Sequence, residues 1–327
     1  MALIDLSLEE LTAYLPERTE PADFDAFWAE TLGDARARHW PARFVPAHPE
    51  LRALDVFDVT YAGYAGQPIR AWLILPRTRS GPVPAVVEYV GYGGGRGLPM
   101  NWLRWPAAGY AAFVMDTRGQ GSGWVSGDTA DVDPDGGGPQ VAGFLTRGIL
   151  DPRTYYYRRV FTDAVMAVAA VREHEAIDPD RVVVAGASQG GGITLAVAAL
   201  EPTVVAALID VPFLSHFRRA IEITDAYPYQ ELRQFLGIHR GRVDDVFRTR
   251  GYMDGLNFAT RARVPALFAV GLMDDVCPPS TVFAAYNHYA GPKEIRVWPW
   301  NGHEAGDAQH SIEKLQFLDG LGFAGPG

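Results

Sequence analysis

The chain has 327 residues and a formal net charge of −10, with 48% hydrophobic and 21% charged residues. This composition is that of a globular protein with a sizeable core, and it excludes a largely disordered chain. The negative charge argues against nucleic acid and anionic membranes as partners, because both bind basic surfaces. A neutral or cationic small-molecule substrate fits this charge better.

The first residues of the sequence bear on where the protein works. Asp5, Glu9 and Glu10 lie where a secretion signal needs basic residues followed by an apolar run. The longest apolar runs are far shorter than the ~18 residues of a membrane span. Cys277 is the only cysteine, which excludes an intramolecular disulfide and a cysteine metal cluster. We therefore expect a cytoplasmic protein that does not enter the membrane.

The first half of the chain changes from helical to β character. Periodicity over Leu8–Leu15 and Phe24–Leu32 predicts a helical extension within residues 1–50. Residues 54–61 and 69–75 alternate between apolar and polar side chains and predict a β-hairpin. From residue 84 onward, short apolar runs alternate with helical segments, as in a mostly parallel sheet covered on both faces. These runs are Ala85–Val90, Ala111–Met115, Val182–Ala185, Val204–Ile209, Ala266–Val270 and Ile295–Trp298.

Two long stretches interrupt this α/β pattern. Residues 117–157 are rich in Gly, Asp and Tyr and too long for a simple connection, so we expect a loop at an interface or at the active site. Residues 213–260 follow the sixth predicted strand and predict a mostly helical, cap-like insertion. Between them, Tyr157–Glu173 has the clearest helical periodicity. Neither a repeat nor a linker composition is present, so we expect one domain over residues 1–327.

The strongest catalytic motif is Gly186-Ala187-Ser188-Gln189-Gly190. It lies between a β-branched run and a helix-forming run, which is the context of a nucleophile elbow. In that turn the serine is held in a strained conformation, and the flanking glycines remove side chains that would meet neighbouring backbone. The motif predicts Ser188 as a nucleophile with its hydroxyl exposed at the edge of a sheet.

A serine hydroxyl needs a histidine base, and that histidine needs a carboxylate to orient it. In α/β-hydrolases these residues follow the nucleophile in the order acid, then histidine, on loops after later strands. Asp274 directly follows one predicted strand, and His303 follows the last one. Asp275 competes with Asp274 for the role of the acid, and spacing alone does not separate the two.

The tetrahedral intermediate of ester hydrolysis needs two backbone donors aimed at its oxyanion. One is expected to be the N–H of Gln189, at the start of the helix after Ser188. The other is expected from the glycine-rich loop Gly91–Gly97, where the backbone can approach the substrate closely. This loop contains no phosphate-binding pattern.

Two short motifs resemble metal sites and are rejected. Asp131–Gly136 looks like the start of a calcium loop, but Ala142 stands where a bidentate glutamate is required, so we expect a solvated acidic turn. His303-Glu304 is followed by Asp307 where a zinc helix needs a second histidine. We expect neither a metal nor another cofactor.

Three motifs together carry a family resemblance: Arg118-Gly119-Gln120, Gly186–Gly190 and His303-Glu304. With them the chain resembles carbohydrate esterase family 7, the acetyl xylan esterases and cephalosporin-C deacetylases, over nearly its whole length. The resemblance implies an α/β-hydrolase fold, a cytoplasmic homohexamer whose active sites face an internal cavity, and a role for the 117–157 loop in assembly. One departure is Ala305, where family members often have a glycine.

The resemblance also assigns roles to individual residues. It implies Ser188, Asp274 and His303 as the catalytic triad. It implies the N–H groups of Tyr92 and Gln189 as the oxyanion hole. The remaining assignments are an acyl pocket of Tyr92, Phe213, Val276 and Cys277, and structural support from Arg118, Gln120 and Glu304.

The resulting prediction is a serine esterase that removes acetyl groups from acetylated xylo-oligosaccharides and related small acetate esters, including cephalosporin C. A broad short-chain carboxylesterase or a peptidase on the same fold is the first alternative, and it would need a deeper pocket built by residues 213–260. A more remote alternative is a binding protein that has lost catalysis. A damaged triad or oxyanion loop would indicate it, and neither is seen in the sequence.

Overall fold

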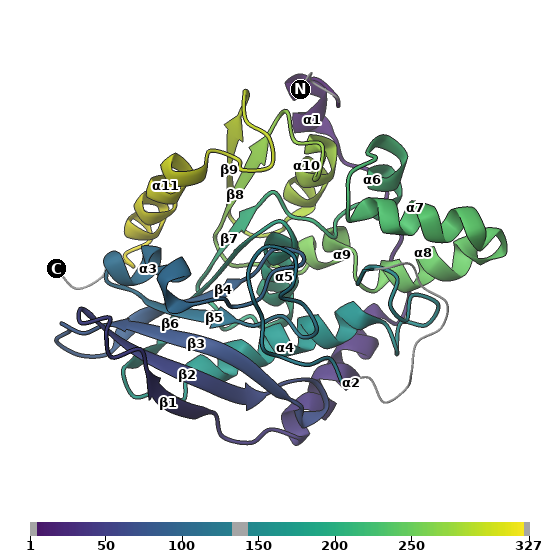
Figure 1. Ribbon diagram of the computed structural model, residues 1–327. Helices are drawn as coiled ribbons and strands as arrows, with labels where there is room; N and C mark the ends of the chain where they lie inside the picture. The colour runs from purple at the N-terminus through teal and green to yellow at the C-terminus, as the bar shows by residue number, and fades with distance from the viewer. Residues whose placement is uncertain (1–4, 133–142, 324–327) are drawn as a thin grey trace.

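A nine-stranded sheet runs through the part of the chain that the computed structural model describes, residues 5–132 and 143–323 (Figure 1). Helices pack on both of its faces, so the predicted α/β class with a mostly parallel sheet is confirmed. The strands are β1 (Arg43–Ala47), β2 (Leu54–Ala62), β3 (Pro68–Pro76), β4 (Val83–Tyr89), β5 (Ala111–Met115), β6 (Ile177–Ala187), β7 (Ala206–Asp210), β8 (Ala266–Gly271) and β9 (Lys293–Trp298).

The strand order is β1-β2-β3-β5-β4-β6-β7-β8-β9. Strands β2 and β3 form the predicted hairpin, with Asp58 opposite Trp72, and β3 continues antiparallel to β5. From β5 to β9 all neighbours are parallel, so their carboxyl ends lie along one edge. This common edge brings together residues that are far apart in the sequence.

Strand β1 was not predicted, since a helical extension was the only element expected within residues 1–50. It pairs with β2 alone and forms one edge of the sheet. An edge strand tolerates Pro46, which has no N–H to donate to a neighbouring strand. The side chains of β1 show no clear alternation of burial. With β1 counted, the helical insertion follows β7, the seventh strand.

The core is divided between the two faces of the sheet. Along β5, Phe113 belongs to one apolar cluster and Val114 to the other, as expected for a strand buried on both sides. Helices α3 (Arg104–Ala107) and α11 (Asp307–Gly320) contribute Trp105 and Leu318 to one face. Every other α-helix of the described residues contributes to the other face. The segment predicted as Tyr157–Glu173 is helix α4 (Tyr156–Val171).

The two long stretches have different structures. Residues 117–132 and 143–155 contain no helix or strand, and residues 133–142 of the predicted loop lie outside the described residues. The 213–260 insertion contains four short helices and a 3-10 turn. In the described ranges, every helix is too short or too polar to cross a membrane. The α-helices are α1 (Leu8–Ala13), α2 (Phe24–Ala37), α3 (Arg104–Ala107), α4 (Tyr156–Val171), α5 (Gln189–Leu200), α6 (Phe217–Ile223), α7 (Tyr229–Ile238), α8 (Val243–Gly251), α9 (Gly255–Ala259), α10 (Pro279–His288) and α11 (Asp307–Gly320), and the 3-10 turns are η1 (Tyr64–Gly66), η2 (Pro99–Trp102) and η3 (Arg240–Arg242).

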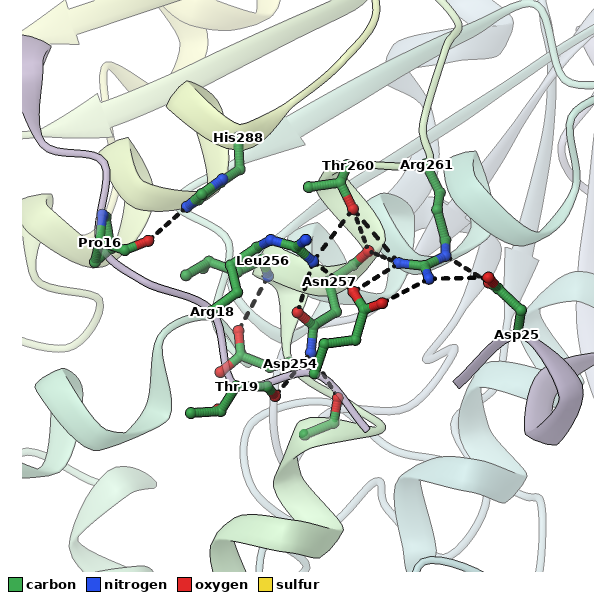
Figure 2. A network of polar contacts seen from close by, with 12 residues as sticks. Pro16, Arg18, Thr19, Asp25, Asp254, Leu256, Asn257, Thr260, Arg261 and His288 are labelled. Carbon is green, nitrogen blue, oxygen red and sulfur yellow. Dashed lines mark hydrogen bonds and ion pairs between the residues drawn. The ribbon is translucent and has the colours of Figure 1, made fainter. Parts of the chain in front are cut away.

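A network of polar contacts attaches the N-terminal segment to α9 and α10 (Figure 2). The Arg261 guanidinium binds Asp25, with Nε 2.6 Å from Oδ1, and also binds Glu20. Arg18 donates to Asn257, and His288 Nε2 donates to the carbonyl of Pro16 at 2.8 Å. The N-terminal extension is thereby fixed against the later part of the chain.

His216 contacts the N-terminal part of the chain as well, with its Nε2 2.9 Å from the Tyr14 hydroxyl. Burial lowers the pKa of His216 to about 4, and nearby positive charge acts in the same direction. Below its usual pKa of about 6.5, the unfolded chain binds a proton that the native protein does not, so stability decreases as pH falls from about 6.5 towards 4. Between pH 7 and pH 5, we expect the free energy of unfolding to fall by on the order of 1–2 kcal/mol more in the wild type than in His216→Asn.

Asparagine suits this test because residue 216 has φ 49°, and asparagine tolerates left-handed backbone. Urea unfolding of both proteins at pH 7 and pH 5 gives the difference. Equal losses in the wild type and in His216→Asn would contradict the assignment of this pH dependence to His216.

Candidate active site

Ser188 is the single residue between β6 and α5. Its φ of 58° and ψ of −119° place it in a strained conformation that non-glycine residues seldom adopt. A Cβ on Gly190 would lie 2.1 Å from the Tyr89 carbonyl oxygen, and one on Gly186 would lie 2.4 Å from the backbone of Gly190. Both glycines are therefore required by the close approach of β4, β6 and α5 at the elbow.

The elbow opens into a cavity of about 410 Å³ at the carboxyl edge of the sheet. Ser188 and His303 both border this cavity, which brings the predicted nucleophile and base together. The lining residues are Glu88, Tyr89, Val90, Gly91, Tyr92, Trp102, Trp124, Ala187, Ser188, Tyr227, Pro228, Val276 and His303.

Asp274 is hydrogen-bonded to His303. Its Oδ2 lies 2.9 Å from His303 Nδ1, and its Oδ1 accepts the N–H groups of Val276 and Cys277 at 2.8 and 2.9 Å. Asp274 is fully buried at the end of β8, whereas the His303 side chain is 35% exposed. The Asp275 carboxylate has no such contact, and its carbonyl accepts the Thr224 hydroxyl. The structure thus places Asp274, and not Asp275, at His303.

The same region contains a possible metal ligand set. Ligand atoms of Asp274, Cys277 and His303 lie within 4.8 Å of one another. Both Asp274 oxygens already accept hydrogen bonds, and burial followed by the nearby Asp274 charge raises the pKa of the Cys277 thiol well above its usual range. A neutral thiol is a poor metal ligand, so the donors fit a histidine-orienting carboxylate better than a metal centre.

The two segments expected to form the oxyanion hole are joined by glutamine side chains. Gln120 Oε1 accepts the N–H of Gly93 at 2.7 Å, and its Nε2 donates to Gln189 Oε1 at 2.8 Å. Gln189 also donates to the carbonyl of Val90. As the first residue of α5, Gln189 has no acceptor within its own helix for its backbone N–H. Gln120 therefore links the glycine-rich loop to the elbow.

Arg118 supports the site from a distance. Its guanidinium is fully buried and binds Asp163 through two hydrogen bonds of 2.6 and 2.7 Å. Burial alone would lower the pKa of Arg118, but the Asp163 carboxylate outweighs burial and raises it. Asp163 also accepts the N–H of Tyr64, and Arg118 donates to Gln67. The pair ties the 117–157 stretch to α4 and to the turn between β2 and β3, and it touches no triad residue.

Asp131 corrects the expectation of a solvated acidic turn. Its side chain is only 3% exposed and forms ion pairs with Arg147 and Arg159, and it lies 3.5 Å from Arg118. Three arginines rather than water surround this carboxylate. The rest of the acidic motif, from Asp133 onward, lies outside the described residues.

Glu304 holds the loop that carries His303. It accepts the side-chain amide of Asn301 at 2.8 Å and the N–H of Gly302 at 3.1 Å, and these bonds lower its pKa. Ala305 has φ 41°, a left-handed conformation that glycine adopts more readily than alanine.

The predicted acyl-pocket residues are divided between two layers. Tyr92 and Val276 line the cavity. Phe213 and Cys277 are fully buried behind it. The Phe213 ring lies 6.1 Å from that of Tyr92, and the Ser188 hydroxyl is near enough to the Cys277 thiol to oppose the effect of burial on the thiol pKa. The buried pair limits how far the wall near Ser188 can yield.

Glu231 is a site residue that the sequence analysis missed. It lies on α7 in the 213–260 insertion and accepts the Tyr92 hydroxyl at 2.5 Å and the N–H of Leu145 at 2.9 Å. The Tyr92 hydroxyl in turn accepts the N–H of Phe144 at 2.6 Å. Burial raises the pKa of Glu231 and of Tyr92. The insertion thus fixes the loop that carries the expected oxyanion donor.

We expect Tyr92→Phe to lower kcat for p-nitrophenyl acetate about tenfold or more, with little change in KM. The ring and backbone remain, but the hydroxyl that binds Glu231 is lost and the oxyanion loop is less well held. Tyr110→Phe is the matched control, because the buried Tyr110 hydroxyl has no hydrogen-bond partner among the described residues. Equal kinetics in the two variants would show that this contact does not position the loop.

The fold and the site geometry define an α/β hydrolase: an elbow serine, with an acid and a histidine after β8 and β9. A family model of acetyl xylan esterase (AXE1) matches residues 1–321. The chain therefore belongs to the acetyl xylan esterase family, whose members are carboxylic ester hydrolases.

Individual relatives agree with this membership. The structure of an acetyl xylan esterase from Paenibacillus sp. R4 superposes with a TM-score of 0.91 at 38% identity, covering 96% of this chain and 99% of that one. Acetyl Xylan Esterase 1 from Thermoanaerobacterium sp. JW/SL YS485 gives 0.88 at 34% identity, covering 97% and 99%. Acetyl esterase Axe7A of Xylanibacter ruminicola is 28% identical over 297 residues, which span 88% of this chain and 64% of Axe7A.

Proposed function

We propose that this protein is a serine esterase that releases acetate from acetylated xylo-oligosaccharides and from related small acetate esters, including cephalosporin C. The observation that carries the proposal is the cavity shared by Ser188 and His303, with Asp274 bound to the far side of the histidine. The names of the two similar solved structures support the substrate class.

In the proposed mechanism, Ser188 attacks the acetyl carbonyl while His303 Nε2 takes its proton. The carbonyl oxygen becomes an oxyanion that the N–H groups of Tyr92 and Gln189 stabilise. His303 then protonates the departing alcohol, leaving an acetyl-serine. Water repeats the sequence, with His303 as its base, and acetate leaves.

The packing near Ser188 supports a preference for acetate. Phe213 and Cys277 are fully buried behind the wall near Ser188, and packed side chains resist displacement by extra methylenes. The role of Asp274 in this scheme is to hold one tautomer of His303 and to stabilise its charged form.

We further propose, from the family resemblance, a cytoplasmic homohexamer that acts on small molecules.

The test is hydrolysis of p-nitrophenyl acetate, butyrate and octanoate by the wild type and Ser188→Ala, beside acetate release from acetylated xylo-oligosaccharides. We expect a steep preference for acetate, acetate release from the sugar, and loss of both in the variant. Comparable or higher rates on octanoate would instead indicate a broad carboxylesterase. Absence of any turnover that depends on Ser188 would favour a binding protein.

A further inference from the structure

Two exposed aromatic side chains border the cavity that contains Ser188. Trp124 is 63% exposed and Tyr227 is 58% exposed, and both line this cavity together with the half-buried Trp102. Large apolar side chains exposed together at a concave site mark a binding surface. None of these aromatic residues belongs to the triad or to the oxyanion segments described above.

Each of these rings is held in place. Trp124 Nε1 donates to the carbonyl of Tyr92 at 3.0 Å, and Trp102 Nε1 donates to the carbonyl of Arg96 at 2.6 Å. The Tyr227 hydroxyl accepts the Gln234 amide at 2.6 Å. A ring fixed before a ligand arrives loses little conformational freedom on binding.

Trp124 is exposed because it lies over the glycine-rich loop. A Cβ on Gly94 would lie 2.6 Å from atoms of the indole ring, and one on Gly91 would lie 3.6 Å from it. The indole thus packs against bare backbone while most of its surface stays open. Such an arrangement presents a flat apolar surface beside the active serine.

The position of this surface determines what it contacts. The acetyl group must lie at Ser188 and its oxyanion donors, where Val276 and the buried Phe213 and Cys277 confine it. The alcohol half of the ester therefore extends towards the exposed residues. A pyranose ring has an apolar face of C–H groups and a rim of hydroxyls, so it suits an exposed indole face better than a purely polar surface does.

We propose that Trp124, together with Tyr227, forms a stacking wall for the pyranose ring of the departing sugar and thereby determines specificity for sugar acetates. The inference rests on the proposed function, since it concerns the alcohol half of the same ester. The hydrogen bond from Trp124 to Tyr92 also joins this wall to the oxyanion loop, so the two roles must be separated experimentally.

The test compares kcat/KM for acetylated xylo-oligosaccharides with kcat/KM for methyl acetate, which has no ring. Trp124→Ala removes the ring and its hydrogen bond, whereas Trp124→Phe keeps an aromatic face and loses only the hydrogen bond. We expect Trp124→Ala to lower kcat/KM for the acetylated xylo-oligosaccharides about tenfold more than kcat/KM for methyl acetate, mainly by raising KM. Trp124→Phe should recover most of this additional loss on the sugar substrate. Tyr227→Ala should act in the same direction.

Trp300→Ala is the matched control, because Trp300 is 82% exposed and lies outside the residues that line the cavity. It should leave the ratio of the two substrates unchanged. Equal losses on both substrates in Trp124→Ala, with no recovery in Trp124→Phe, would mean that Trp124 acts only by holding Tyr92. That result would contradict sugar stacking on Trp124.

A second readout does not require turnover of a sugar ester. Unacetylated xylotriose should inhibit methyl acetate hydrolysis competitively in the wild type and at least tenfold more weakly in Trp124→Ala. Xylotriose inhibition that is absent, or equal in the two proteins, would contradict sugar stacking on Trp124. A wild type that hydrolyses methyl acetate but releases no acetate from sugars would overturn the proposed function, even if xylotriose binds.

Discussion

Asp274→Asn should lower kcat for acetate esters by about 10⁴-fold and change KM little. The asparagine side chain fits the same space but favours the wrong tautomer of His303 and no longer stabilises its positive charge. The 2.9 Å contact between Asp274 Oδ2 and His303 Nδ1 is the physical basis of this expectation. Steady-state kinetics with p-nitrophenyl acetate measure it.

Asp275→Asn is the control for this change, because it alters the neighbouring carboxylate, which has no contact with His303. Its kcat should stay within about threefold of the wild-type value, since it removes no group that acts in the transition state. The reverse pattern, a large loss in Asp275→Asn and a small one in Asp274→Asn, would transfer the role of the acid to Asp275.

Arg118→Met should reduce the free energy of unfolding by about 3–5 kcal/mol. The substitution leaves Asp163, which is about 1% exposed, without its bidentate partner in the interior. An unpaired buried charge is strongly destabilising, whereas a paired one contributes little. Urea unfolding monitored by circular dichroism measures the loss.

The matched control is Arg153→Met, which breaks an ion pair of similar length with Glu30 at 3.0 Å, with both side chains more than half exposed. Exposed pairs contribute about 0–1 kcal/mol, so this variant should be nearly as stable as the wild type. Adding Asp163→Asn to Arg118→Met should recover part of the loss. Similar losses in the two arginine variants would contradict a structural role for the buried pair.

The sequence predicted the strands that are buried on both faces, because a continuous apolar run bounded by turn residues has few other interpretations. The whole of β5, for example, was expected within its observed bounds. Strand β1 was missed because an edge strand is half exposed and contains Pro46, so it lacks both alternation and a continuous apolar run.

The residues of the candidate site also fall into those that the sequence predicted and those that it missed. Ser188, His303 and the neighbouring acids Asp274 and Asp275 could be selected because they lie just beyond strands, and the carboxyl ends of parallel strands meet at one edge. Only the family resemblance favoured Asp274 over Asp275. Glu231 and Asp163 lie on helices, 139 and 45 residues away from the partners they bind. No local pattern distinguishes such a carboxylate from a solvated one, so only the three-dimensional structure identifies it.

The packing of α2 against residues near the end of the insertion has a consequence for synthesis of the chain. Trp28 Nε1 donates to the carbonyl of Tyr252, 224 residues later, and its ring lies 5.6 Å from that of Phe258. On the ribosome, α2 therefore emerges long before Tyr252 and Phe258, which cover part of its aromatic face, have been made. Until they follow, this part of the nascent protein exposes apolar surface of the kind that chaperones recognise. Completion of the fold thus depends on the last third of the chain returning to the first helices.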